Sequence, residues 1–271
     1  MSKGFFPYPG GKAQYADWII EHFPNHECYV EAFGGGAGVL FNKPRSKIEV
    51  YNDINGDVWN FFDVFNRRPD DLTDRLEDVY YAEPQFRDWE DADPDDPIER
   101  AARFFFFRYA NWGSKLEPAG FRRMKHRSVA DQFRDAVEDL SDKADRIHGV
   151  TIERLDWADV VDKYDSADTL FYFDPPYVGP GDDLYGHDGD FDHDRFVDRL
   201  PDVDGDWVVS YETLPDRIHG YEHVAERNTK NRVSNGQEDN PSERTERLLM
   251  NFDPDDRDQF AGANQASVGD F

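Results

Sequence analysis

The apolar and polar positions of this chain predict short buried strands near both ends and helices between them. Short runs of apolar, β-branched and aromatic residues, some alternating with polar residues, are typical of strands in a buried sheet. Five segments have this pattern: 28–33, 48–53, 169–174, 206–212 and 247–252. The apolar content of 58–65 predicts a helix, and 39–43 is expected to begin or continue another. Strands that alternate with helices predict an α/β fold.

The pattern changes twice along the chain, which indicates an insertion. Residues 67–150 are expected to be mostly helical, whereas strands and helices alternate again from 151 to 252. A length of 271 residues suits one large domain that carries an insertion. We therefore predict one α/β domain made of 1–66 and 151–252, an inserted domain at 67–150, and a flexible acidic tail at 253–271, which lacks periodicity.

Charge is the most unusual feature of the composition. Asp and Glu total 58 against 31 Lys and Arg, for a net charge of −27, and only 9 of the basic residues are lysine. An acid excess with little lysine is typical of proteins from a salty cytoplasm, so we predict a halophilic context. The alternative is that the acidity excludes nucleic acid as a partner. Because salt at about 1 M screens charges beyond about 3 Å, local charge matters more than the total.

We expect a cytoplasmic protein without a bound metal. No apolar run approaches the roughly 18 residues of a membrane span. The start MSKGFFPYPGGK lacks the long apolar core of a signal peptide. Cys28 is the single cysteine, which excludes an internal disulfide and a cysteine-based zinc site. The eight histidines show no spacing typical of metal ligands.

A glycine-rich turn and an acid at the next strand end indicate a nucleoside site. EAFGGGAG (31–38) follows the first predicted strand, and Asp53 ends the second, 19 residues after Gly34. An acid about 20 residues after such a turn binds ribose hydroxyls in nucleotide-binding α/β folds. No Gly-Lys-Ser/Thr follows, so the ligand is expected to lack a phosphate chain. The alternative is a plain turn beside a surface aspartate, and PYPGGK (7–12) is likewise either a loop that covers a ligand or a simple turn.

The segment FYFDPPY (171–177) places an acid, two prolines and a tyrosine at the end of an apolar strand. Because Pro175 and Pro176 cannot donate ladder hydrogen bonds, the strand must end at Asp174. Open α/β sheets bind their ligands at such carboxyl ends. A carboxylate, the fixed carbonyl of Pro175 and the ring of Tyr177 suit a planar conjugated amine with two N–H donors. The alternative is a capped strand end with a core tyrosine.

Taken together, PYPGGK, YVEAFGGGAGVLFN, YNDINGDV and FYFDPPY, in this order, closely resemble the DNA adenine N6-methyltransferase (Dam) family over about residues 5–252. The resemblance implies a Rossmann-like sheet that binds S-adenosylmethionine, with a mostly helical inserted target-recognition domain. Tyr8 stands where most members have tryptophan. The implied donor-site residues are Tyr8, Lys12, Phe33, Gly34, Gly35, Gly36, Asp53, Asp156 and Asp174, and the implied catalytic residues are Asp174, Pro175, Pro176 and Tyr177.

The resemblance also implies a mechanism. Asp174 and the Pro175 carbonyl would accept the two hydrogens of an adenine amino group, which frees the nitrogen lone pair for attack on the methyl group. Asp156 would bind the adenine amino group of the donor, and Tyr177 would stack on the target base. No metal is needed, and the base must be flipped out of the helix to reach the site.

Residues 100–134 contain nine basic and two acidic residues in an otherwise very acidic chain. Contact with phosphate explains such a segment, and an amphipathic helix with a solvated face is the alternative. The segment lies where the family has its target-recognition domain. We expect double-stranded DNA as partner and a monomer, with a cognate restriction endonuclease as a candidate partner. The DNA-binding candidates are Asn111, Arg122, Arg123 and Lys125.

Near the other end, 227–252 is expected to form a polar loop that leads into a strand, which in the family contributes to the target-base pocket. A surface hairpin is the alternative. Two other functions remain open. A methyltransferase that acts on RNA or on protein glutamine usually has Asn in place of Asp174. A DNA-binding relative without catalysis would not need the intact DPPY and FGGGAG segments.

Overall fold

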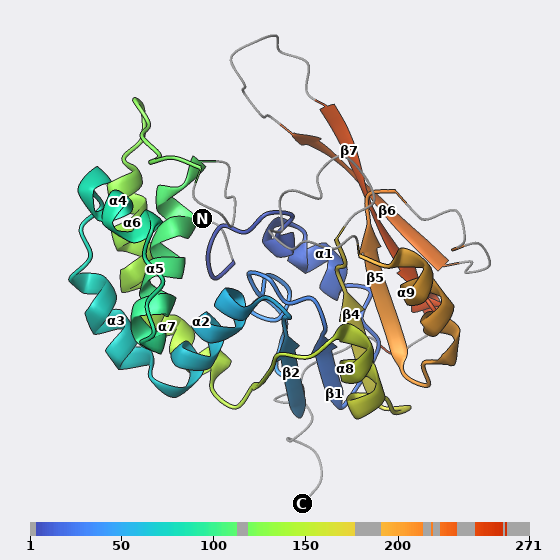
Figure 1. The fold of residues 1–271 in the computed structure, drawn as a ribbon. Coiled ribbons are helices and arrows are strands. Elements are labelled where there is room, and N and C mark those ends of the chain that lie inside the picture. The colour runs from blue at the N-terminus through green and yellow to red at the C-terminus, as the bar shows by residue number, and fades with distance from the viewer. Residues whose placement is uncertain are drawn as a thin grey trace, which may run out of the picture.

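The computed structural model describes residues 4–112, 119–176, 191–213, 218, 223–231, 242–256 and 258. Its centre is a seven-stranded sheet with the order β3-β2-β1-β4-β5-β7-β6 (Figure 1). Strands β1 to β5 run parallel, while β7 runs antiparallel to both β5 and β6. The strands are β1 Cys28–Glu31, β2 Ile48–Asn52, β3 Thr151–Glu153, β4 Thr169–Phe173, β5 Asp206–Tyr211, β6 His223–Asn231 and β7 Ser242–Met250.

The helices begin at residues that suit helix starts. Asn55, Asp96, Ser128, Asp156 and Asp192 each accept hydrogen bonds from backbone amides of the first turn that follows, which stabilises α2, α5, α6, α8 and α9. Helices α3 to α7 gather on one side of the sheet in Figure 1. The helices are α1 Ala16–Ile20, α2 Gly56–Arg67, α3 Pro69–Glu77, α4 Glu83–Glu90, α5 Pro97–Ala110, α6 Val129–Glu138, α7 Leu140–Ile147, α8 Trp157–Tyr164 and α9 His193–Arg199.

Both faces of the sheet are covered, as a parallel sheet requires. On one face, side chains of β1, β2, β4 and β5 pack against α8 and α9. On the other face, the apolar core runs without a break from the sheet through α2 to α5 and α6. Phe61 of α2 stacks on Phe105 of α5, with ring centroids 5.6 Å apart. The helical segment is therefore packed onto the sheet through a shared aromatic core.

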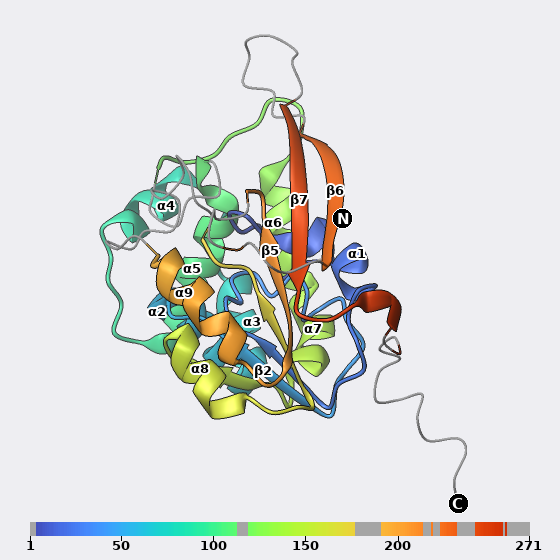
Figure 2. The same cartoon turned by 90° about the vertical axis from the view of Figure 1, so that its right-hand side faces the viewer.

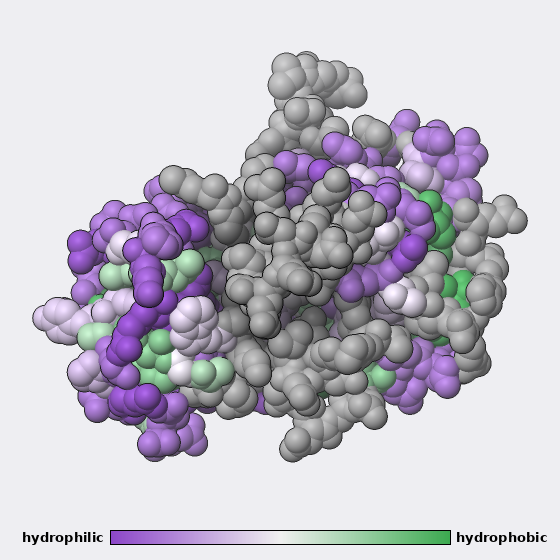
Figure 3. Space-filling model, turned by 90° about the horizontal axis from the view of Figure 1, so that it is seen from above, coloured by the Kyte–Doolittle hydropathy of each residue, from purple (hydrophilic) through white to green (hydrophobic). Residues whose placement is uncertain are grey.

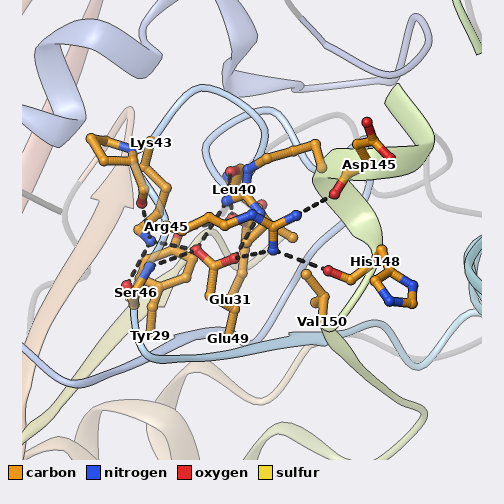
Figure 4. Close-up of polar contacts among 12 residues, drawn as sticks. Tyr29, Glu31, Leu40, Lys43, Arg45, Ser46, Glu49, Asp145, His148 and Val150 are labelled. Atoms are coloured by element: carbon orange, nitrogen blue, oxygen red, sulfur yellow. Dashed lines mark hydrogen bonds and ion pairs between the residues drawn. The ribbon is translucent and has the colours of Figure 1, made fainter. Parts of the chain in front are cut away.

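A buried ion-pair network also ties α7 to the sheet (Figure 4). Glu49 of β2 accepts from Lys43 at 2.7 Å and from both terminal nitrogens of Arg146 at 2.6 and 2.9 Å. Arg45 donates to the carbonyl of His148 at 3.0 Å. Burial lowers the pKa of the Lys43 ammonium to about 8, although Glu49 opposes this shift. The network fixes the loop after β1 against both the sheet and α7.

The structure confirms the predicted α/β fold and all five predicted strands. The strand expected at 247–252 begins earlier, at Ser242, and two strands were missed, β3 and β6. The helix expected at 39–43 is wrong, because residues 35–42 form consecutive turns. These turns let the Leu40 amide donate to the buried carboxyl of Glu31 at 2.8 Å. Residues 227–231, at the start of the segment expected to form a polar loop, lie in β6 and pair with β7, and residues 232–241 lie outside the described residues.

At the start of the predicted tail, Pro254–Asp256 form a short 3-10 helix, and the Asp258 carbonyl accepts from the Asn25 amide at 2.9 Å. The rest of the tail lies outside the described residues. Over the helical part, the described surface seen in Figure 3 is mostly hydrophilic with scattered apolar residues. Among the helices of the described ranges, none combines the length and apolar character needed to cross a membrane.

Candidate active site

The candidate site lies where β1, β2 and β4 end. These strands are parallel neighbours, so their carboxyl ends meet at one edge of the sheet. Glu31 ends β1, whereas Asp53 and Asp174 each follow directly after the last residue of β2 and β4. The topology thus brings together three acids that are far apart in sequence.

Asp53 holds the glycine-rich turn in place. Its Oδ2 accepts from the Gly35 amide and its Oδ1 from the Asn55 amide, both at 2.8 Å. Gly35 has a φ of +46°, which disfavours a residue with a side chain. A Cβ at Gly34 would lie 2.0 Å from the Tyr51 ring. The turn therefore needs glycine partly because aromatic rings pack directly on its backbone. The sequence analysis attributed the glycines to the approach of a ligand and did not predict these ring contacts.

Tyr8 and Lys12 of the opening segment reach the same region. A Cβ at Gly35 would lie 2.7 Å from Cε1 of Tyr8, so this ring packs against the turn. The ammonium of Lys12 lies 2.8 Å from Oδ1 of Asp174 and 3.6 Å from Oε1 of Glu246 on β7. Lys12 and Glu246 are each only 5% exposed. The segment PYPGGK is thus attached to the acid at the end of β4.

Glu246 was missed by the sequence argument. It lies two residues before Leu248 and four before Met250, which belong to the core on the same face of the sheet, whereas Leu249 belongs to the opposite core. Because side chains alternate along a strand, Glu246 occupies an inward position. An acid in phase with buried apolar residues is the signal that could have identified it.

Glu31 adds a second buried acid beside Asp174. Its Oε2 accepts from the Tyr29 hydroxyl and from the Leu40 amide, each at 2.8 Å. Burial raises the pKa of the Glu31 carboxyl to about 8, and the negative charge of Asp174 acts in the same direction. Burial, and after it the charge of Asp174, also holds the pKa of the Tyr172 hydroxyl well above its usual range. Additional negative charge is therefore disfavoured in the site.

Among the predicted catalytic residues, Asp174 and Pro176 are partly exposed and Pro175 is buried. This places the carboxylate at the surface of the site and the first proline beneath it. Tyr177 lies outside the described residues. No cis peptide bond occurs in the described part of the chain.

Asp156 and Phe33 lie toward the α8 and α9 side of the sheet. Asp156 begins α8 and accepts from the Ala158 amide at 3.0 Å. Arg195 of α9 donates to both carboxylate oxygens of Asp156, at 2.8 and 3.2 Å. The ring of Phe33 packs edge-on against Phe173, with centroids 6.4 Å apart. Arg195 is a partner of the predicted donor site that sequence spacing did not reveal.

The four DNA-binding candidates have different environments. Asn111 is fully buried, and its Oδ1 accepts from the Ala119 amide at 2.6 Å, so it closes a loop in this structure. Arg122 is partly buried, whereas Arg123 and Lys125 are exposed. Arg123 pairs with Glu83 of α4. Positive charge that can face a partner is therefore concentrated around 122–127, just after the residues that Asn111 holds.

Not every basic residue counted in 100–134 contributes to this surface. Arg108 is 1% exposed, with its guanidinium 4.7 Å from the centroid of the Phe104 ring. Arg100 pairs with Asp57 at 3.0 Å. Lys115 lies outside the described residues. In the described part of the chain, no group of three or more His, Cys, Asp or Glu side chains is placed to hold a metal ion.

A sheet of this strand order, with one antiparallel strand inserted near its edge and acids at the carboxyl ends, has the Rossmann-like fold of methyltransferases. Residues 8–204 match the family model of the D12 class N6 adenine-specific DNA methyltransferases. The chain therefore belongs to this family of adenine-specific DNA methyltransferases, which confirms the resemblance seen in its motifs.

Two curated relatives agree with this assignment. The type II methyltransferase M.MjaIII of Methanocaldococcus jannaschii is 27% identical over an alignment 209 positions long, and the alignment covers 65% of this chain and 69% of that protein. A DNA adenine methylase of Serratia marcescens is 31% identical over 71 residues, which are 26% of this chain and 26% of that protein. Both names describe transfer of methyl groups, and the second names adenine in DNA as the target.

Proposed function

We propose that this protein transfers the methyl group of S-adenosylmethionine to the amino nitrogen of an adenine flipped out of double-stranded DNA, at a specific sequence. The observation that carries this proposal is the position of Asp174. Its carboxylate follows the last residue of a central strand, directly before the buried Pro175, at the same edge of the sheet as the glycine-rich turn that Asp53 holds.

The charge of the site fits this methyl donor. Asp174 and Glu246 contribute two carboxyl groups beside the ammonium of Lys12, and Glu31 contributes a third close enough to Asp174 to feel its charge. A deficit of positive charge favours a ligand that carries a sulfonium and an ammonium group. When bound, S-adenosylmethionine supplies a methyl group that is electrophilic because it is attached to a positive sulfur.

The proposed donor site uses residues of four segments. Tyr8 and Lys12 cover it, and Gly34, Gly35 and Gly36 let the donor approach the backbone. Asp53 accepts from the ribose hydroxyls, and Ile54, an exposed apolar residue next to it, offers a face to the adenine ring. Phe33 and Asp156 complete the site on the side of α8, where Arg195 orients the Asp156 carboxylate.

The proposed chemistry rests on two acceptors. Asp174 and the carbonyl of Pro175 accept the two N–H groups of the adenine amino nitrogen and so localise its lone pair. The nitrogen would then form a bond to the methyl carbon while the carbon–sulfur bond breaks with its electron pair left on sulfur, and the nitrogen would release one proton to solvent. Pro176 and Tyr177 belong to the same motif, and Tyr177 is proposed to stack on the flipped base.

The proposed DNA surface is the segment 122–127 within a target-recognition domain formed by 67–150. Arg122, Arg123 and Lys125 would contact phosphates, and Asn111 would shape the loop that presents them. Local positive charge makes such contact compatible with a net charge of −27. The acid excess and the scarcity of lysine support a halophilic context, in which the enzyme would act as a cytoplasmic monomer. A cognate restriction endonuclease is the proposed partner.

A methyl-transfer assay tests the proposal. Purified protein and labelled S-adenosylmethionine are incubated with unmethylated genomic DNA in molar salt, and single-molecule sequencing maps N6-methyladenine. We expect one methylated sequence motif, and loss of transfer in Asp174→Ala with donor and DNA binding retained. Label in RNA or protein instead would favour the alternative substrates, and wild-type protein that binds DNA without transfer to any substrate would favour an inactive relative.

A further inference from the structure

Among the contacts of the described residues, oxygens from three segments of the chain lie near the ammonium of Lys12. They are the carbonyl of Gly10 at 3.0 Å, Oδ1 of Asp174 at 2.8 Å and Oε1 of Glu246 at 3.6 Å. An ammonium group has three N–H donors, so it can point one hydrogen toward each oxygen. Lys12 thereby links the opening loop, the end of β4 and the β6–β7 hairpin.

The burial of Glu246 is costly for stability. Its neighbour Arg247 pairs with Glu226 on the hairpin, at 2.7 Å and largely exposed, whereas Glu246 is 5% exposed. A carboxylate on an inward strand position costs free energy unless it is paired, and even a buried ion pair is often no more stable than apolar residues of the same volume. A role in the site explains this residue better than a role in stability.

The groups around Asp174 are Glu31 on β1, Tyr172 on β4, Tyr211 on β5 and Lys12 in the opening loop. Of these, Tyr172 and Lys12 also interact with Glu246. Burial raises the pKa of Tyr172 most, and the charges of Asp174 and then of Glu246 raise it further. Glu246 is therefore close enough to influence two of the groups that the predicted catalytic carboxylate influences.

The hairpin that carries Glu246 is next to the opening loop. Figures 1 and 2 both show α1, which follows the Lys12 segment, beside the base of β6 and β7. The guanidinium of Arg227 on β6 lies 5.9 Å from the centroid of the Trp18 ring on α1. Contacts from the same hairpin thus reach both the loop and the short helix that follows it.

We propose that Glu246 is a positioning residue for methyl transfer, which holds the Lys12 ammonium on Asp174 and offsets part of its positive charge. This inference rests on the proposed function of the site. Lys12 alone would neutralise Asp174 and weaken it as an acceptor of the adenine N–H. With Glu246 on the other side of the ammonium, Asp174 keeps a fixed orientation and enough negative charge to accept that hydrogen.

The test compares Glu246→Gln with wild-type protein in the methyl-transfer assay. Glutamine keeps the volume and one acceptor oxygen but removes the charge. We expect kcat to fall roughly 10-fold to 100-fold, as for a displaced catalytic group, with KM for DNA and donor changed less than about 3-fold. We also expect the acid limb of the kcat profile to move to lower pH, because loss of a nearby negative charge lets the remaining carboxyls ionise more easily.

Two further variants separate positioning from folding. Glu226→Gln removes an exposed acid from the same hairpin and should leave kcat and the pH profile unchanged. Glu246→Asp keeps the charge and should restore part of the activity and the wild-type pH profile. Thermal unfolding of each variant shows whether a loss of activity is caused by poor folding. If Glu246→Gln folds poorly, Glu246→Asp is compared with wild-type protein in its place.

A double-mutant cycle tests whether Glu246 acts through Lys12. In a Lys12→Met background, Glu246→Gln should cause less than about a 2-fold further loss of kcat. Fully additive losses, or an active wild-type enzyme whose kcat and pH profile are unaffected by Glu246→Gln, would overturn the inference and leave the proposed function intact. A wild-type protein that transfers no methyl group to any DNA would overturn both.

Discussion

Replacement of Glu31 by glutamine is expected to make the protein more stable at alkaline pH. Glu31 is 2% exposed and its carboxyl accepts two hydrogen bonds on Oε2, from the Tyr29 hydroxyl and the Leu40 amide. The amide oxygen of glutamine can accept both. The variant then differs from the wild type only in that it cannot ionise. It therefore avoids the free-energy cost of a buried negative charge near Asp174.

The magnitude follows from the pKa of Glu31, which burial raises from 4.5 to about 8. Because the folded state binds this proton more tightly than the unfolded state, wild-type stability falls as pH rises from about 4.5 to about 8 and then levels off. A difference of 3.5 pH units corresponds to about 5 kcal/mol. The variant lacks this contribution, so its advantage should grow as the pH rises from about 4.5 to about 8 and vanish in acid.

Denaturant unfolding without ligand, in one salt buffer at about pH 5, 7 and 9, measures this difference. We expect the free energies of unfolding of the two proteins to agree within about 1 kcal/mol at about pH 5 and the variant to be more stable by about 5 kcal/mol at about pH 9. Other ionisable groups cancel in the difference. A constant difference in the free energy of unfolding across this range would refute the argument, because it would mean that the pKa of Glu31 is the same in the folded and unfolded states.

Further predictions concern the turn, the ion-pair network and the two ligands. Asp53→Ala should weaken S-adenosylmethionine binding by roughly 10-fold to 100-fold in calorimetry, since it removes the proposed acceptor of the ribose hydroxyls and the anchor of the turn. Glu49→Ala should lower the free energy of unfolding by about 3–5 kcal/mol because it leaves the Lys43 ammonium buried without this carboxylate, and unchanged denaturant midpoints would contradict this. Gly34→Ala should cost about 1–3 kcal/mol in the same assay, given the 2.0 Å approach of its Cβ to a ring carbon. Lys125→Ala should weaken DNA binding equally for all sequences and reduce the slope of log K against log salt by about 1, and a sequence-dependent loss would argue for base contact.

Local sequence was sufficient to locate the two acids that follow the central strands. Asp53 and Asp174 each come directly after an apolar run, and Pro175 and Pro176 end the second run because they cannot donate to a neighbouring strand. These signals depend only on residues close together in the chain. The same is true of the glycine-rich turn. Its contacts with Tyr8 and Tyr51, however, depend on tertiary packing and could not be predicted from the local sequence.

The tertiary structure alone decided which distant side chains join these acids. Glu246, Arg195 and Arg146 reach the site or its support from strands and helices far along the chain, so no spacing along the sequence relates them to Lys12, Asp156 or Glu49. The sequence also did not indicate that Asn111 is buried, because its side chain is polar and is nevertheless completely enclosed. Turns at 35–42 stand in place of the helix expected at 39–43, and they let the Leu40 amide donate to Glu31. Periodicity records which residues prefer the interior, whereas the pairing of charges depends on where the folded strands and helices bring them together.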